Sequence, residues 1–141
     1  MKKFVRIMAL TLVAVMLCAT LASCGAPAKD PAKAVDALKE DGYATTKDDT
    51  VIPALLKLAG YDLKSVVTGT KTAEDKDGNK TVEHVSVFYF ADKDNAEKAL
   101  DKVKEYASDD KKESDESTWV EPTRSGAMVY YGTKAAIKAA K

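Results

Sequence analysis

The chain is predicted to fold as one α+β domain, with helices packed on one face of an antiparallel sheet. Val- and Thr-rich runs over residues 65–73 and 82–90 flank Asp77-Gly78, which is the pattern of a β-hairpin. Segments with apolar residues at helical spacing precede, separate and follow the strand segments. The expected order is therefore ααββαββα, which contains an αββ unit twice and favours a duplicated layout.

Two short helices are expected before the hairpin. Asp30 is placed to cap the first helix, Pro31 suits its first position, and Gly42 ends it. The second helix begins after one of the capping residues 48–50 and ends at Gly60. The apolar side chains of the two helices are Ala34, Val35, Ala37, Leu38, Leu55, Leu56, Leu58 and Ala59.

The segment Val82 to Phe90 is the strongest strand signal, and its second half is apolar on both faces, which is typical of a central strand. If Phe88 and Phe90 pack under the helices, then Val85, Val87 and Tyr89 point to the opposite side of the sheet. We expect these three residues to need a cover, and they are the candidate interaction surface. The cover could be the first helix, a second copy of the chain, or another protein.

A third helix follows the hairpin. Asp94 and Glu97 fit a capping box at its start. Its expected core stripe consists of Ala96, Ala99, Leu100, Val103 and Ala107. Residues 108–117 are predicted to form a polar loop, and a strand starts at Trp119, is broken over 122–126 and resumes over 127–131. A short helix over 134–140 closes the domain.

The N-terminal segment has the features of an export signal. Lys2, Lys3 and Arg6 precede an apolar run over residues 7–22, which is shorter than the roughly 20 residues that a spanning helix needs. The run ends in Leu21-Ala22-Ser23-Cys24. This motif resembles the lipobox of bacterial lipoproteins, in which an apolar residue and two small residues precede a cysteine.

The resemblance implies that Cys24 receives a diacylglyceryl group and that a signal peptidase cleaves between Ser23 and Cys24. Residues 1–23 would be removed, 24–29 would form a short lipid-anchored tether, and 30–141 would form the single domain. The protein would then lie outside the cytoplasm, anchored to the cell membrane or to an outer membrane where the organism has one. The alternative is an ordinary cleaved signal with a chance cysteine at its end.

Charge and cysteine content exclude some functions for the domain. Removal of the signal leaves 19 basic and 22 acidic residues, a net charge of −3, which makes the domain a poor nucleic-acid binder. Cys18 leaves with the signal and Cys24 is alkylated, so we expect no disulfide and no cysteine-based zinc site.

The segment from Phe88 to Leu100 resembles the third strand and second helix of RNA-recognition domains. The positions that carry exposed, base-stacking aromatics in that family hold Val85 and Val87 here. The resemblance therefore implies a ferredoxin-like or related fold and not nucleic-acid binding.

No metal, cofactor or catalytic site is predicted. Asp75, Asp77 and Asn79 have the 1-3-5 spacing of a calcium loop, but glycine is absent from position 6 and an acidic residue from position 12. His84 is the only histidine, and no glycine elbow or Ser/His/Asp order accompanies it.

We therefore expect a non-enzymatic interaction protein of the cell envelope. Its partner would be another envelope protein, a peptide or a second copy of the chain. The alternative is a small-ligand carrier or sensor with a pocket between sheet and helices, bordered by Tyr43, Tyr61 and Trp119. A hydrolase is a third class, without a specific motif to favour it.

Overall fold

The computed structural model describes residues 25–141, so the predicted signal segment, with Ser23 and Cys24, lies outside the described residues. The α+β class and the antiparallel sheet are confirmed. Five strands lie in the order β1-β2-β3-β5-β4, and every neighbouring pair is antiparallel. The strands are β1 Ala44–Asp48, β2 Leu63–Glu74, β3 Lys80–Phe90, β4 Trp119–Ser125 and β5 Met128–Thr133.

The expected hairpin and central strand are confirmed. β2 and β3 pair from Glu74 opposite Lys80 to Leu63 opposite Phe90, with one register shift between Leu63 and Ser65. Gly78 adopts a φ of 79° in the turn between them, a conformation that favours glycine. β3 lies in the middle of the sheet, because β2 and β5 flank it.

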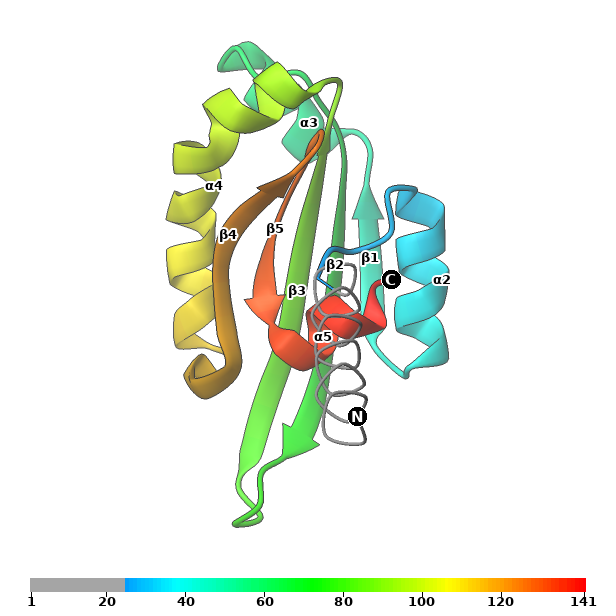
Figure 1. The fold of residues 1–141 in the computed structure, drawn as a ribbon, viewed down its shortest axis with the longest axis vertical. Coiled ribbons are helices and arrows are strands. Elements are labelled where there is room, and N and C mark those ends of the chain that lie inside the picture. The colour runs from blue at the N-terminus through cyan, green and yellow to red at the C-terminus, as the bar shows by residue number, and fades with distance from the viewer. Residues whose placement is uncertain (1–24) are drawn as a thin grey trace, which may run out of the picture.

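Helices cover both faces of this sheet, which corrects the expectation of helices on one face (Figure 1). One face carries α2 Pro31–Glu40 and α5 Lys134–Ala139. The other carries α3 Val51–Leu58 and the long α4 Lys93–Lys112. The sheet therefore separates two apolar clusters, and neither face is left open along its centre.

The strand order fits the duplicated αββ layout. The units α3-β2-β3 and α4-β4-β5 contribute the four strands β2-β3-β5-β4, with the second strand of each unit in the middle. Corresponding helices α3 and α4 lie on the same face. The segments outside the two units, α2, β1 and α5, extend the sheet by one edge strand and cover its other face.

The capping of α2 is as predicted, and that of α4 is not. The Asp30 side chain accepts the backbone N–H of Ala32, and Gly42 follows α2 with a φ of 82°. In α4, Asp92 and not Asp94 is the N-cap, and its carboxylate accepts the backbone N–H of Asn95 at 2.8 Å.

Three further details differ from the sequence prediction. Residues 44–48 form the edge strand β1, which was not predicted because only one of its five residues is apolar. α4 continues to Lys112 through the segment expected to be a loop, and a 3-10 turn over Glu116–Thr118 leads into β4. β4 also continues past Pro122, with a register irregularity between Val120 and Thr123 that accommodates the missing proline N–H.

Close backbone packing holds β3 against β5. Gly132 lies opposite Val85, and a Cβ atom added to Gly132 would stand 2.1 Å from the carbonyl oxygen of His84. Among residues 25–141, no helix is both long and apolar enough to cross a membrane.

Candidate functional site

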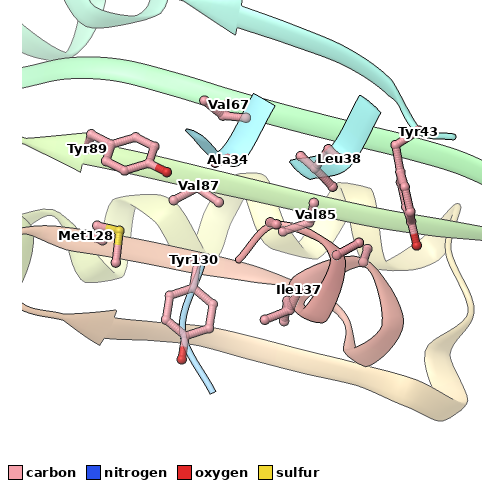
Figure 2. Packing of buried hydrophobic residues seen from close by; sticks show 13 residues of the cluster. Ala34, Leu38, Tyr43, Val67, Val85, Val87, Tyr89, Met128, Tyr130 and Ile137 are labelled. Atoms are coloured by element: carbon pink, nitrogen blue, oxygen red, sulfur yellow. The ribbon is translucent and has the colours of Figure 1, made fainter. Parts of the chain in front are cut away.

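The predicted interaction surface is not exposed. Val85 and Val87 are fully buried, and Tyr89 is 6 % exposed. Figure 2 shows that Leu38 of α2 and Ile137 of α5 lie over this part of the sheet. Of the three covers considered, the structure shows the first helix, α2, together with α5 from the other end of the sequence. Val85, Val87 and Tyr89 therefore need a cover, as expected, but they do not offer a docking surface.

The expected tether also belongs to this covered face. Pro27 is buried, and Ala26 and Ala28 pack against the apolar cluster under α2 and α5. The Tyr89 hydroxyl donates to the carbonyl of Ala28 at 2.7 Å, and the backbone N–H of Ala28 donates to the carbonyl of Ala140 at 2.8 Å. Residues 26–28 are thus fixed to the domain, so most of the segment expected to be a tether packs on the domain instead.

The exposed apolar side chains gather instead on α3. Val51 is 64 % exposed, Leu55 59 % and Leu58 89 %. These residues follow the i, i+4, i+7 spacing, so they lie on one face of the helix. Only Pro53 and Leu56 of α3 are buried. We call Val51, Leu55 and Leu58 the α3 stripe.

Beside α3 the surface is hollowed between α3, α4 and the sheet, with a volume of about 280 Å³. We call this cavity the α3–α4 hollow. Its apolar walls include Ile52 of α3 and Tyr106 of α4. Tyr106 is itself 39 % exposed and stacks on Phe88, with ring centroids 6.2 Å apart.

A polar cluster forms one part of the wall of the α3–α4 hollow. His84 Nε2 lies 2.9 Å from Ser86 Oγ and 3.3 Å from Asp110 Oδ2. The Tyr131 hydroxyl donates to the same Asp110 oxygen at 2.5 Å. β3, β5 and α4 each contribute to this cluster, so it forms only because α4 extends past the predicted loop start.

The charges of this cluster are set by its hydrogen bonds. Burial alone raises the pKa of the Asp110 carboxyl, but hydrogen bonds from His84 and Tyr131 outweigh burial, and the net pKa lies below its ordinary value. Burial and the bond to Asp110 raise the pKa of the Tyr131 hydroxyl. Asp110 is therefore an anion that accepts hydrogen bonds from His84 and Tyr131.

The cluster does not have the geometry of a Ser-His-Asp triad. In a triad the serine and the carboxylate bind opposite nitrogens of the imidazole. Here Ser86 and Asp110 both approach Nε2 of His84. His84 and Ser86 are also buried, at 8 % and 4 % exposure, so the arrangement fixes side chains in the wall and does not present a nucleophile.

The residues suggested as borders of a ligand pocket do not meet. Tyr43 lies in the cluster under α2, and its hydroxyl donates to Glu83 at 2.5 Å. Tyr61 and Trp119 pack against the opposite cluster, under α3 and α4. None of these three residues lines the α3–α4 hollow.

The acidic residues at the hairpin close a turn. One Asp75 carboxylate oxygen accepts the backbone N–H groups of Asp77 and Asn79, each at 2.9 Å. These and further hydrogen bonds hold the pKa of Asp75 below its ordinary value. Within residues 25–141, no three His, Cys, Asp or Glu side chains are grouped so that they could hold a metal ion.

Sequence reasoning missed the α3 stripe as a functional feature, although its spacing is visible in the sequence. The same i, i+4 pattern predicts burial for most helices, and no local feature of the sequence distinguishes an exposed stripe from a buried one.

Comparison of the chain with protein-family models, with curated proteins and with solved structures finds no match.

Proposed function

We propose that the protein is a lipid-anchored, non-enzymatic interaction module of the cell envelope, which binds a partner protein over the α3 stripe and the adjoining α3–α4 hollow. The observation that carries this proposal is the exposure of Val51, Leu55 and Leu58 on one helix face. The lipid anchor is the one that the lipobox ending in Cys24 implies.

The α3 stripe differs from the scattered apolar residues of an ordinary surface. Single exposed leucines are common, whereas adjacent ones beside an apolar hollow mark an interaction site. Burial of one such side chain contributes about 1.5–3 kcal/mol before the cost of association is subtracted. The α3 stripe supplies exposed apolar side chains, and the wall of the α3–α4 hollow adds the half-exposed Tyr106 ring and the polar side chains of Asp109 and Asp110.

The position of the stripe suits a tethered protein. The chain enters the domain through residues 26–28, which pack on the face of the sheet covered by α2 and α5. The α3 stripe belongs to the opposite layer. A partner can therefore reach α3 while the entry point of the chain stays at the membrane.

The anchor is tested by metabolic labelling. Cys24→Ala should abolish labelling with a palmitate analogue, because the thiol that forms the thioether is gone. Cys18→Ala is the matched control, since Cys18 lies inside the segment to be removed, and it should label like the parent protein. Unchanged labelling of Cys24→Ala would refute lipidation at this residue.

The interaction surface is tested by crosslinking in cells from a photoreactive residue at position 58. We expect a discrete crosslinked product that is lost in Leu55→Lys and retained in Thr72→Lys, which adds the same charge at an exposed position of β2. Both variants should melt like the parent protein. An equal product with Leu55→Lys would contradict the proposed surface.

A second candidate, a small-ligand carrier, is favoured by one observation. The α3–α4 hollow combines apolar walls with the Asp110 carboxylate, a combination that orients small ligands carrying a hydrogen-bond donor. Its volume of about 280 Å³ limits the ligand to a small molecule. Small amines that raise the melting temperature of the parent protein, and not of Asp110→Asn, would favour this function.

A further inference from the structure

The surface of α5 lies next to the point where the lipid anchor would join the domain. Gly25, the residue after Cys24, lines a second hollow of about 460 Å³ together with Lys134, Lys138 and Lys141. Residues 26–28 are fixed by packing and hydrogen bonds, so little chain is free to move between anchor and domain. Because Gly25 directly follows Cys24 in the sequence, a lipid on Cys24 would be attached one residue from the lining of this α5 hollow.

The charged side chains around the α5 hollow have one sign. Lys134 and Lys138 are exposed one turn apart on α5, Lys141 is exposed just beyond the end of this helix, and no Asp or Glu side chain lines the hollow. Among the described residues, neither Lys134 nor Lys138 takes part in an ion pair. This basic group contrasts with the net charge of −3 of the mature chain.

The floor of the α5 hollow is apolar. Val120, Tyr130 and Ile137 line it beneath the lysines. Lysine side chains can lie along such a surface with their aliphatic stems and present the ammonium groups at its rim. An apolar floor with a cationic rim matches the boundary between the headgroups and acyl chains of a bilayer.

We propose that the α5 face binds the headgroups of acidic phospholipids in the leaflet that holds the Cys24 lipid, so that the domain lies on the membrane in one orientation. This inference rests on the proposed function, because lipidation at Cys24 is what brings the α5 hollow to the bilayer. Ammonium groups attract anionic headgroups within about one Debye length of the surface. In this orientation α3 and α4, on the other side of the sheet, face away from the bilayer.

The test uses the mature chain, residues 24–141, made without the signal, with Cys24→Ser so that no lipid is attached. All described elements and both apolar clusters lie within it. Binding is measured by flotation with vesicles of phosphatidylglycerol and phosphatidylcholine in equal parts, and with vesicles of phosphatidylcholine alone. We expect binding to the acidic vesicles only, weakened when salt rises from about 0.1 M to about 0.5 M.

Charge variants locate the binding surface. The double variant Lys134→Gln/Lys138→Gln should bind acidic vesicles about 25-fold more weakly, at roughly fivefold per lysine. Lys93→Gln/Lys98→Gln, which changes the same charge on exposed positions of α4, should bind like the parent chain. Equal losses in both double variants, or no binding of the parent chain, would overturn the proposal.

One further outcome would also overturn the proposal. If inorganic phosphate at millimolar concentration occupies the α5 hollow while acidic vesicles do not bind, the surface recognises a soluble anion and the proposal fails. Because the chain in this assay carries no lipid, its result is independent of Cys24 labelling. The labelling assay therefore tests lipidation, and the flotation assay tests headgroup binding independently of it.

Discussion

Helices α2 and α3 are built from the same local signals but relate to the core in opposite ways. Each follows an aspartate that accepts backbone N–H groups at its start, and each is followed by a glycine with positive φ. α2 buries Ala34 and Leu38 completely. α3 buries Leu56 but leaves Leu55 and Leu58 in solvent. Capping and stop residues thus specify that a segment is helical, but they do not specify how much of the helix is buried in the core.

The difference comes from what lies beneath each helix. α2 packs over the middle of β2, where Gly69 lacks a side chain, and a Cβ atom there would stand 3.0 Å from Leu38 Cδ1. α5 contacts α2 on the same face. α3 lies at one end of the sheet (Figure 1), beside the α3–α4 hollow instead of a second packed helix. Its outer residues consequently have no intramolecular partner surface.

The largest expected loss of stability comes from a substitution on the face of the sheet that α2 and α5 cover. Val87→Lys places a charge under α2 and α5, and an uncompensated buried charge costs about 3–5 kcal/mol. Denaturant unfolding should show this loss, while light scattering should show an unchanged mass, since the cover belongs to the same chain. Leu55→Lys, the same charge on α3, should stay within about 0.5 kcal/mol of the parent protein.

A pair of truncations compares the two helices directly. Leu38→Ala should cost about 2–5 kcal/mol, because it leaves a cavity above Gly69. Leu58→Ala should change the free energy of unfolding by less than about 0.5 kcal/mol, because 89 % of Leu58 is already exposed. Equal losses in the two variants would show that α3 is covered in solution.

A smaller effect is expected at the helix starts. Asp48 accepts three backbone N–H groups, those of Thr50, Val51 and Ile52, whereas Asp30 accepts that of Ala32. Asp48→Ala should therefore lower the melting temperature more than Asp30→Ala, because α3 has less burial to hold it. Asp49→Ala, an adjacent exposed aspartate, is the control and should melt close to the parent protein.

The smallest effect is a pH dependence in the wall of the α3–α4 hollow. The folded-state pKa of Asp110 is lowered, so the stability it contributes is present above the unfolded pKa of about 3.9 and is lost as pH falls through the folded pKa. Asp110→Asn keeps an acceptor for Tyr131 but does not titrate. Urea midpoints between about pH 6 and about pH 2 should therefore fall less steeply for Asp110→Asn than for the parent protein. Parallel curves would contradict this role.

Much of the fold could be predicted because its signals are local. The hairpin turn around Gly78, the cap at Asp30 and the central position of β3 all follow from residues close in sequence. Val103 is fully buried as its helical spacing predicts, and Leu100 is partly buried against the same cluster. The edge strand β1 was missed because its pairing with β2, and not its own composition, makes it a strand.

The candidate site was less predictable because its parts come from distant segments. His84 and Asp110 are brought together by β3 and by the last turns of α4, which the sequence indicated as a loop. A polar helix end carries no apolar stripe, so hydrophobic periodicity cannot detect it. The contact between α4 and the sheet is what orders those turns.

By itself, the sequence determined which residues alternate across the sheet. Phe88 and Phe90 lie on one face, and Val85, Val87 and Tyr89 lie on the other, because side chains along a strand alternate strictly. The motif Leu21-Ala22-Ser23-Cys24, which resembles a lipobox, is likewise visible in the sequence alone.

Only the tertiary structure decided which apolar surfaces are covered. α2 and α5, more than ninety residues apart in sequence, meet on one face and bury the residues that the pattern had left open. α3 carries equally apolar residues at equal spacing but meets no such partner. Burial depends on which elements are brought together in space, and hydrophobic periodicity records only that an element has an apolar face.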